Sequence, residues 1–317
     1  MSNDSQASEP KVPSRTIGFS VMSVVIAIVA AFLFQQQNQQ STDSAPGSEI
    51  PIPSEVDGFR SDQWYLPDDP LLGFVEIPAG SFTMGSNPAL DRMAYENERW
   101  SNARRQGRVD LPRYYVSRYE TSVAQFAAYL NAVGMEAGEV PLTGPPALPV
   151  TYITWPEALA YTRWLDQQLR ESPDTPLELK AFLDSGARVT LPTEAEWEKA
   201  ARGTEGQVFP WQNIPPESVA NFNGAQPRAV NAVDCQACVW GLSDMSGNVW
   251  ELTASPMQPY PYSDDDDTEN LTDDALWIMR GGSFADGLAN IRAAVRGGVD
   301  PGVRNIAIGF RTVISTR

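Results

Sequence analysis

The first pattern along the chain is a long apolar run near the N-terminus. Residues 16–34 carry no charged side chain, and Lys11 and Arg15 stand just before them. At ~1.5 Å per helical residue the run spans ~28 Å, about the hydrocarbon thickness of a bilayer. It predicts a signal-anchor helix of a single-pass inner-membrane protein. The positive-inside rule places residues 1–15 in the cytoplasm and residues 35–317 in the periplasm.

A cleaved signal peptide is the alternative to an anchor. Its apolar stretch would be shorter and would end in a site of small residues, whereas AAFLFQQQ follows here. Residues 35–63 are then polar and rich in Gln, Ser and Pro, a composition typical of a flexible tether. No further shift of composition and no repeat follows, so residues 64–317 are expected to form one domain.

Short strands and amphipathic helices follow the tether. Residues 74–85 alternate apolar and polar positions around a Pro-Ala-Gly turn, which predicts a hairpin of two short strands. Residues 113–120 predict another strand. A helix to residue 133 follows it, behind an N-cap at Thr121 or Ser122.

Two capping boxes mark further helices. One opens a helix over residues 154–169 and the other opens a helix over residues 193–202. Residues 171–187 between them are interpreted as a surface insertion, with an extra helical turn at 177–183. Beyond Gly203 the helical period is lost, and short strands joined by long loops are expected to the C-terminus.

Composition narrows the possible functions. Nine tryptophans, 23 glycines and 26 prolines indicate a loop-rich fold held by large side chains. The net charge of −17 argues against nucleic acid as a partner, because phosphate recognition needs clustered cations. The chain has no histidine, which excludes histidine-based triads and histidine-ligated iron or zinc sites.

The chain has two cysteines, Cys235 and Cys238, in the sequence C-Q-A-C. In an oxidising compartment this spacing favours a local disulfide that staples a loop. A redox-active dithiol is the alternative. Zinc is not expected, since two cysteines without histidine do not complete a tetrahedral site.

Several motifs appear in the order known from one family. They include FVEIPAGSFTMGS, RYETSVAQF, RVTLPTEAEWEKAARG, GLSDMSGNVWELT, RGGSF and IGFR. On these motifs, residues 72–315 resemble the formylglycine-generating enzyme, or sulfatase-modifying factor, family. The resemblance implies an α+β, C-type-lectin-like fold with little regular secondary structure.

The resemblance also implies structural calcium in the loop GLSDMSGNVWELT. Carboxylates and backbone carbonyls suit this hard cation, and glycine lets a carbonyl turn inward. The alternative is that the two carboxylates only accept N–H groups of the loop. The implied first site comprises Asp244, Gly247, Val249 and Glu251. A second site, whose later ligands fall where the chain is shortened, starts at Asn221 and Phe222.

Catalytic members of the family hold copper with two cysteines just after the GGS motif. Here the stretch reads RGGSFADGLANIRAAVRGG and contains neither cysteine. Thiolates select Cu(I), and the side chains of Asp286, Asn290 or Ile291 do not replace them. Copper and the sulfatase-activating reaction are therefore not expected.

The same stretch is the place of the family's substrate groove. Its arginines could bind a carboxylate or a peptide backbone, or they could pair with this chain's own acids. Trp250 and Trp277 could likewise pack in the core or stack on a ligand. The candidate groove residues are Arg280, Ser283, Asp286, Asn290, Arg292 and Arg296.

Two functions follow from these observations. The first is a membrane-tethered, extracytoplasmic module without catalytic residues, which binds a protein, peptide or small molecule. The second is a periplasmic oxidoreductase similar to the pyoverdine-maturation branch of the superfamily. An active sulfatase-modifying factor ranks behind both, since the copper cysteines are missing.

Overall fold

The structure is a computed structural model that describes residues 55–135, 140–142, 144–211, 216–263 and 275–317. The predicted span at 16–34 and the tether up to residue 54 lie outside these ranges. Within these ranges no helix is both long and apolar enough to cross a bilayer. The described residues belong to one compact unit, Glu49–Arg317.

Two four-stranded sheets form the centre of this unit. The first has the order β3-β6-β12-β7, and its strands are antiparallel. The second has the order β10-β9-β8-β11, in which β11 runs parallel to β8. The first sheet contains β3 (Phe74–Ile77), β6 (Tyr114–Ser117), β12 (Val313–Ser315) and β7 (Arg188–Thr190). The second contains β10 (Gly297–Val299), β9 (Trp277–Arg280), β8 (Trp250–Pro256) and β11 (Ile308–Gly309).

The predicted hairpin at residues 74–85 is wrong in its pairing, although both strands form. β3 pairs with β6, whereas β4 (Gly80–Met84) pairs with β5 (Gly107–Leu111) in a separate two-stranded ribbon. The Pro-Ala-Gly connection lacks the Asn-Gly type of turn that closes a two-residue hairpin, which is a physical reason for the difference.

Three predicted helices are confirmed, whereas the turn expected at 177–183 in a surface insertion is an eight-residue helix with Leu179 and Leu183 in the core. These helices are α2 (Val123–Ala132), α3 (Trp155–Glu171), α4 (Leu177–Asp184) and α5 (Glu194–Arg202). Ser122, Thr154 and Thr193 each close a capping box at a helix start. After Gly203 the described residues form strands, loops and 3-10 turns, as predicted. Over all described residues, before and after Gly203, the 3-10 turns are Ser61–Gln63, Glu96–Glu98, Pro216–Ser218, Val239–Gly241 and Leu288–Asn290.

A short antiparallel pair, β1 (Phe59–Arg60) and β2 (Leu66–Pro67), precedes the first sheet. It begins within the residues that we assigned to the tether. Phe59 lies 6.0 Å from Tyr119, measured between ring centroids. The folded domain therefore begins before Trp64, where the sequence predicts its start.

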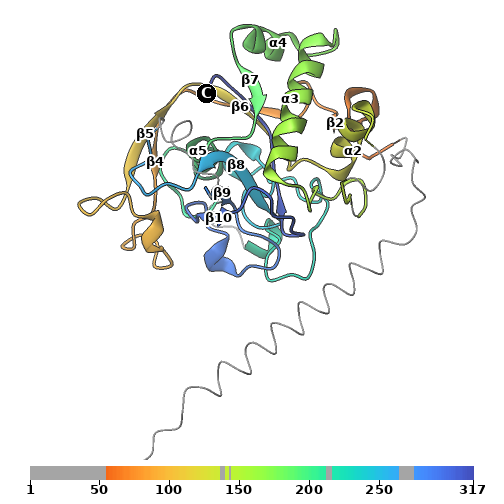
Figure 1. Cartoon of the computed structure of the whole chain (residues 1–317). Helices are drawn as coiled ribbons and strands as arrows, with labels where there is room; N and C mark the ends of the chain where they lie inside the picture. Colours follow the sequence, from red (N-terminus) through yellow and green to blue (C-terminus); the bar gives the residue numbers. More distant parts are fainter. Residues whose placement is uncertain (1–54, 136–139, 143, 212–215, 264–274) are drawn as a thin grey trace, which may run out of the picture. The chain divides into compact units, whose positions relative to one another are not determined.

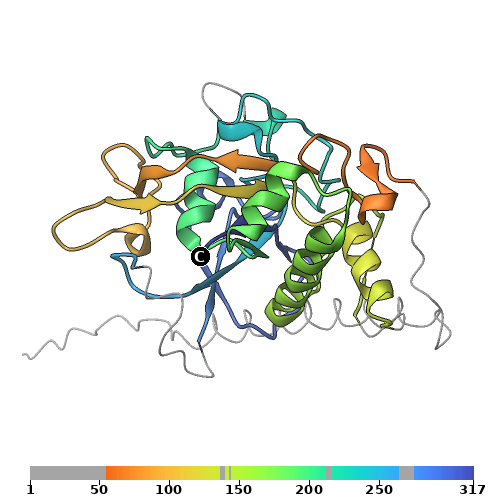
Figure 2. The ribbon, with the colours of Figure 1, turned by 90° about the horizontal axis from the view of Figure 1, so that it is seen from above.

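Helix α5 lies inside the body. Figures 1 and 2 show it between the β4–β5 ribbon on one side and α3 on the other. Every residue of α5 is buried, including Glu194, Glu198 and Arg202. Buried charges need partners, so this helix determines where oppositely charged side chains must lie.

Thr154 provides a test of the helix starts. Its hydroxyl accepts a hydrogen bond from the Glu157 N–H, and the Glu157 carboxylate accepts one from the Thr154 N–H. Replacing Thr154 by Ala is expected to lower the free energy of unfolding by about 1 kcal/mol. Thr154→Ser keeps the hydroxyl and is expected to lose much less. Chemical denaturation of the full chain measures both, and equal losses would contradict the capping role.

Candidate functional site

The loop after β9 is organised by the carboxylate of Asp286. Its Oδ2 accepts hydrogen bonds from the Ser283 hydroxyl at 2.6 Å, the Ser283 N–H at 3.0 Å and the Trp250 indole N–H at 2.9 Å. Its Oδ1 accepts one from the Asn290 amide at 3.0 Å. All four donors are neutral. The loop therefore holds an anionic group with dipoles and not with a cation.

Tyr95 adds a second element to this surface. Its hydroxyl donates to the Asn290 side-chain oxygen at 2.8 Å, and the tyrosine is 44% exposed. Trp250, Asp286 and Asn290 are each partly exposed. The sequence named Ser283, Asp286 and Asn290 as groove residues, and the structure brings them together. It did not name Tyr95, because no local pattern shows a contact across 195 positions.

The candidate arginines are buried and paired with carboxylates of this chain. Arg292 contacts Asp91 at 2.6 Å and Glu98 at 2.7 Å. Arg296 contacts Glu194 at 2.6 Å. Each side chain is at most 3% exposed. Of the two roles left open by the sequence, pairing with internal acids is therefore the one that the structure shows.

Arg280 on β9 is fully buried and joins the same network. It contacts Glu194 at 3.1 Å and also pairs with Glu198, which Arg202 contacts at 2.7 Å. Burial by itself would raise the pKa of Glu198, but the charges of Arg280 and Arg202 outweigh burial and lower it. Glu198 is therefore ionised in the interior, and α5 is bound to β9 by charge.

These buried ion pairs hold the segments that carry the candidate surface residues. Arg292 fixes the segment that carries Asp91 and Glu98, and its guanidinium lies 5.0 Å from the ring centre of Tyr95. That segment places the Tyr95 hydroxyl against Asn290. The buried arginines are thus supports of the surface and not its ligand-binding groups.

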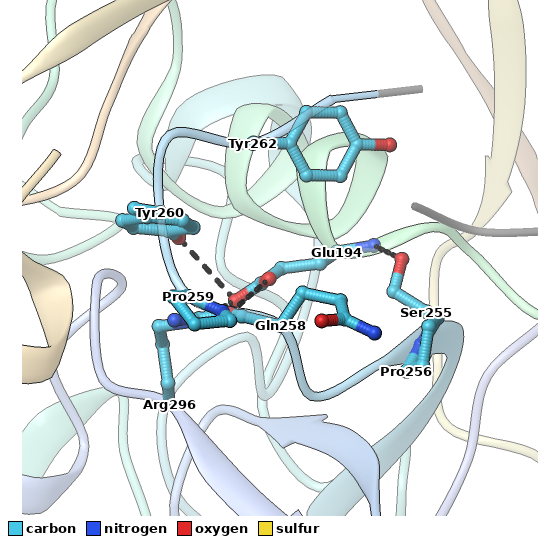
Figure 3. Close-up of a pocket in the computed structure, with 8 residues that line it drawn as sticks. All are labelled: Glu194, Ser255, Pro256, Gln258, Pro259, Tyr260, Tyr262 and Arg296. Atoms are coloured by element: carbon cyan, nitrogen blue, oxygen red, sulfur yellow. Dashed lines mark hydrogen bonds and ion pairs between the residues drawn. The ribbon is translucent and has the colours of Figure 1, made fainter. Parts of the chain in front are cut away.

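A small pocket lies beside this network (Figure 3). It encloses about 200 Å³, including space open to solvent, between the chain after β8 and Arg296. Its floor is the carboxylate of Glu194, which already binds Arg296, Arg280 and the Tyr260 hydroxyl. The Arg296 guanidinium also lies 4.0 Å from the centre of the Tyr260 ring. The charged floor is thus satisfied internally, and the Asp286 loop is the better candidate surface.

The loop GLSDMSGNVWELT is held by a buried ion pair. Glu251 Oε1 lies 2.6 Å from Arg311 Nη2, and its Oε2 accepts hydrogen bonds from Arg311 Nε and the Trp197 indole, each at 2.6 Å. The Glu251 and Arg311 side chains are both 0% exposed. Arg311 also donates to the carbonyl oxygen of Ser243. A guanidinium therefore neutralises the carboxylate and ties the loop to the C-terminal strand.

Asp244 and Glu120 lie close to this pair. Asp244 Oδ1 contacts Arg228 at 2.6 Å, while its Oδ2 is buried without a partner among the described residues. Burial, with the nearby charges of Asp244 and Glu251, raises the pKa of Glu120 well above its ordinary value. Glu120 accepts hydrogen bonds from the Asn248 amide and the Val249 N–H. Three carboxylates thus share two guanidiniums here.

The expected calcium ligands can be compared with this arrangement. Glu251 has both oxygens bound to Arg311 and Trp197, and Asp244 has one free oxygen. Over the described ranges no group of three or more acidic or cysteine side chains could hold a metal ion. As arranged, the carboxylate pair does not fit the implied first site. Calcium binding stays an expectation of the resemblance alone, and the engaged oxygens of Glu251 predict no calcium dependence for this residue.

The residues of the implied second site hold the loop by other means. The Asn221 carbonyl oxygen accepts the Asn248 N–H, and the Asn221 amide donates to the Asn248 side-chain oxygen. A Cβ on Gly247 would lie 2.3 Å from that carbonyl oxygen, and Gly247 has φ +85°, so only glycine fits. Phe222 packs against the small apolar cluster that contains Ile291.

Cys235 and Cys238 form a disulfide, which confirms the predicted local bond. Both cysteines are buried beside Trp211 and Ile291. The bond therefore closes the loop before GLSDMSGNVWELT on itself, and the buried cysteines pack in one apolar cluster with Ile291 of the candidate surface loop. Trp277 stacks on Trp155 at 3.7 Å and is partly buried, so it packs against other side chains of the chain.

The comparisons define the family. Residues 66–316 match the model of the sulfatase-modifying factor enzyme 1-like domain, and the chain belongs to this family. It is 27% identical over 284 residues to hercynine oxygenase of Mycolicibacterium smegmatis, covering 75% of this chain and 60% of the relative. It is 34% identical over 187 residues to inactive C-alpha-formylglycine-generating enzyme 2 of Mus musculus, covering 53% and 49%. The chain thus spans about half to 60% of these curated relatives.

Solved structures agree on the fold. PvdO from Pseudomonas aeruginosa superposes with a TM-score of 0.61 at 24% identity, over 76% of this chain and 94% of that chain. Treponema denticola variable protein 1 superposes with a TM-score of 0.58 at 20% identity, over the same shares. At these identities the similarity supports a mixed α/β fold of this family and no particular activity.

Glu251→Gln tests what holds the loop core. The change leaves the Arg311 guanidinium buried without its counter-ion, so the free energy of unfolding is expected to fall by about 3–5 kcal/mol. The matched control is Glu157→Gln, at the partly exposed pair with Arg304, where a loss of at most about 1 kcal/mol is expected. Chemical denaturation in EDTA and in calcium chloride measures both.

The loss at Glu251 is expected to be the same with and without calcium. Calcium that stabilises the unmodified chain but not the Glu251→Gln variant would instead support Glu251 as a calcium ligand.

Proposed function

We propose that this protein is a membrane-tethered, extracytoplasmic member of its family that binds a partner and lacks formylglycine-generating activity. In this proposal residues 16–34 anchor the chain with its N-terminus inside. The observed disulfide supports an oxidising compartment, where such bonds persist. The domain would then act in the periplasm as an accessory module, with protein, peptide or small-molecule ligands.

One observation supports the proposed lack of formylglycine-generating activity. Asp286 is one of the positions where the resemblance places copper ligands, and four neutral donors occupy its carboxylate. A carboxylate is a hard ligand that does not select Cu(I). The two cysteines are bonded to each other and buried. The proposal therefore assigns no copper and no catalytic residue.

The exposed groups suit recognition. The Trp250 indole offers a partly exposed aromatic face, and the Tyr95 hydroxyl and Asn290 amide offer hydrogen-bonding groups beside it. An apolar face with a few fixed polar groups is typical of sites that bind peptides or small molecules. The buried arginine pairs hold these groups in place before any ligand arrives, which lowers the entropic cost of binding.

The alternative is an oxidoreductase of the pyoverdine-maturation type. Its support is the similarity of the chain to a hercynine oxygenase. It requires turnover of a peptide or small molecule with oxygen. Oxygen uptake with compounds or peptides made by the products of neighbouring biosynthetic genes would favour this alternative over a binding module.

The absence of copper chemistry is directly testable. The full chain, purified in detergent and reduced, is expected to hold far less than one equivalent of Cu(I) and to form no aldehyde on a cysteine-containing peptide. Mass spectrometry of the peptide and metal analysis of the protein measure both. Stoichiometric copper together with an aldehyde product would contradict the proposal.

Trp250→Ala tests the binding surface. It removes the aromatic face and the donor to Asp286, so retention of a molecule that co-purifies with the full chain is expected to fall at least about tenfold. Arg188→Ala, at an exposed position on β7, is the control and is expected to retain it. Mass spectrometry of the bound fraction compares the two. Equal retention by both variants would place binding elsewhere.

A further inference from the structure

The segment that connects β4 to β5 concentrates positive charge on an acidic protein. Residues 99–108, at the end of this segment and the start of β5, contain four arginines and no acid, whereas the whole chain has a net charge of −17. Arg92 lies before them, on the other side of Glu96 and Glu98. A local excess of one sign against the overall charge indicates a surface for an oppositely charged partner. Neither proposed function uses these arginines.

Three of these arginines have guanidinium groups that are available to an external anion. Arg99 and Arg105 share Glu96, at 3.6 Å and 3.3 Å. Arg92, Arg104 and Arg108 are exposed, and none of their guanidinium groups has an ion-pair or hydrogen-bond partner among the described residues. The buried arginines of the scaffold, in contrast, are all paired.

The arginine-bearing segment is held in a defined shape. The Ser101 N–H donates to the Arg104 carbonyl oxygen, and the Trp100 N–H donates to that of Arg105, which closes a tight turn. Trp100 packs against Tyr260 with ring centroids 5.5 Å apart. Figure 2 shows the chain between β4 and β5 projecting from the edge of the body. Arg104 is thus presented on an ordered turn, and Arg108 follows it in β5.

We propose that Arg92, Arg104 and Arg108 dock the folded domain on the anionic phospholipid headgroups of its own membrane. This inference rests on the proposed anchor at residues 16–34. Guanidinium groups bind phosphate through paired hydrogen bonds. Such binding requires only a phosphate group and no specific partner sequence. The result would be a fixed orientation of the candidate surface relative to the bilayer.

The size of the expected binding energy favours docking of a tethered domain on its own membrane over binding of a free partner. One arginine near an anionic bilayer contributes roughly a fivefold preference, so three contribute roughly a hundredfold. For a free partner this corresponds to a dissociation constant of about 10 mM, which is too weak to matter. For a domain already tethered to the surface it is enough to shift the orientation. Acids more than ~8–10 Å from these arginines act weakly on them, because salt screens the interaction over that distance.

The experiment uses the full chain in lipid nanodiscs. Ala103→Cys is exposed beside Arg104 and accepts a nitroxide label, whose collision with a water-soluble relaxation agent reports solvent access. Access is expected to be lower in discs with 30% phosphatidylglycerol than in phosphatidylcholine discs, and to be restored by 0.5 M salt. A label at Ala181→Cys, exposed on α4, is the control site and is expected not to change.

Arg104→Gln with Arg108→Gln is expected to lower the ratio of docked to undocked domain roughly 25-fold, as two fivefold contributions are lost. Arg188→Gln removes an exposed charge elsewhere and is expected to change nothing. Equal access at position 103 in both lipids would overturn the docking while leaving the anchor in place. A chain that does not enter discs at all would contradict the anchor, and the docking proposal with it. Protection independent of lipid charge would indicate a protein contact and would also overturn the proposal.

Discussion

The buried pair between Glu251 and Arg311 is the interaction on which the loop core depends. Both side chains are withdrawn from water, and each compensates a charge that would otherwise cost several kcal/mol to bury. Glu251 belongs to β8 of the second sheet, and Arg311, between β11 and β12, also donates to the Ser117 carbonyl oxygen of β6 in the first sheet. Trp197 of α5 donates to the same carboxylate. One carboxylate thus links both sheets and the central helix.

The same principle extends outward to the candidate surface. Helix α5 brings Glu194 and Glu198 into the interior, and Arg280 and Arg296 must meet them there. Because these guanidiniums belong to the chain around RGGSF, their pairing determines the path of the loop that carries Asp286. A surface without regular secondary structure is in this way held by charge and not by a hydrogen-bonded ladder. Binding groups on such a loop are positioned in advance.

The described structure also separates two uses of arginine in one chain. Arg292 is enclosed and paired, and it acts on the surface only through the segment that it holds. Arg104 is exposed on a projecting turn, and its guanidinium has no partner among the described residues. Residue type does not separate these roles, since both side chains are arginines outside helices and strands. Burial and the location of carboxylates decide between them.

Local patterns determined the helices and the family. The capping boxes at Thr154 and Thr193 act over three residues, so the sequence alone was sufficient to place α3 and α5. The motif order was sufficient to assign the family, and the C-Q-A-C spacing to favour a disulfide. Only the tertiary structure decided that the segment 74–85 divides between two sheets, that Arg311 neutralises Glu251, and that Tyr95 reaches Asn290. Each of these contacts joins residues far apart in the chain, and a local pattern carries no information about such partners.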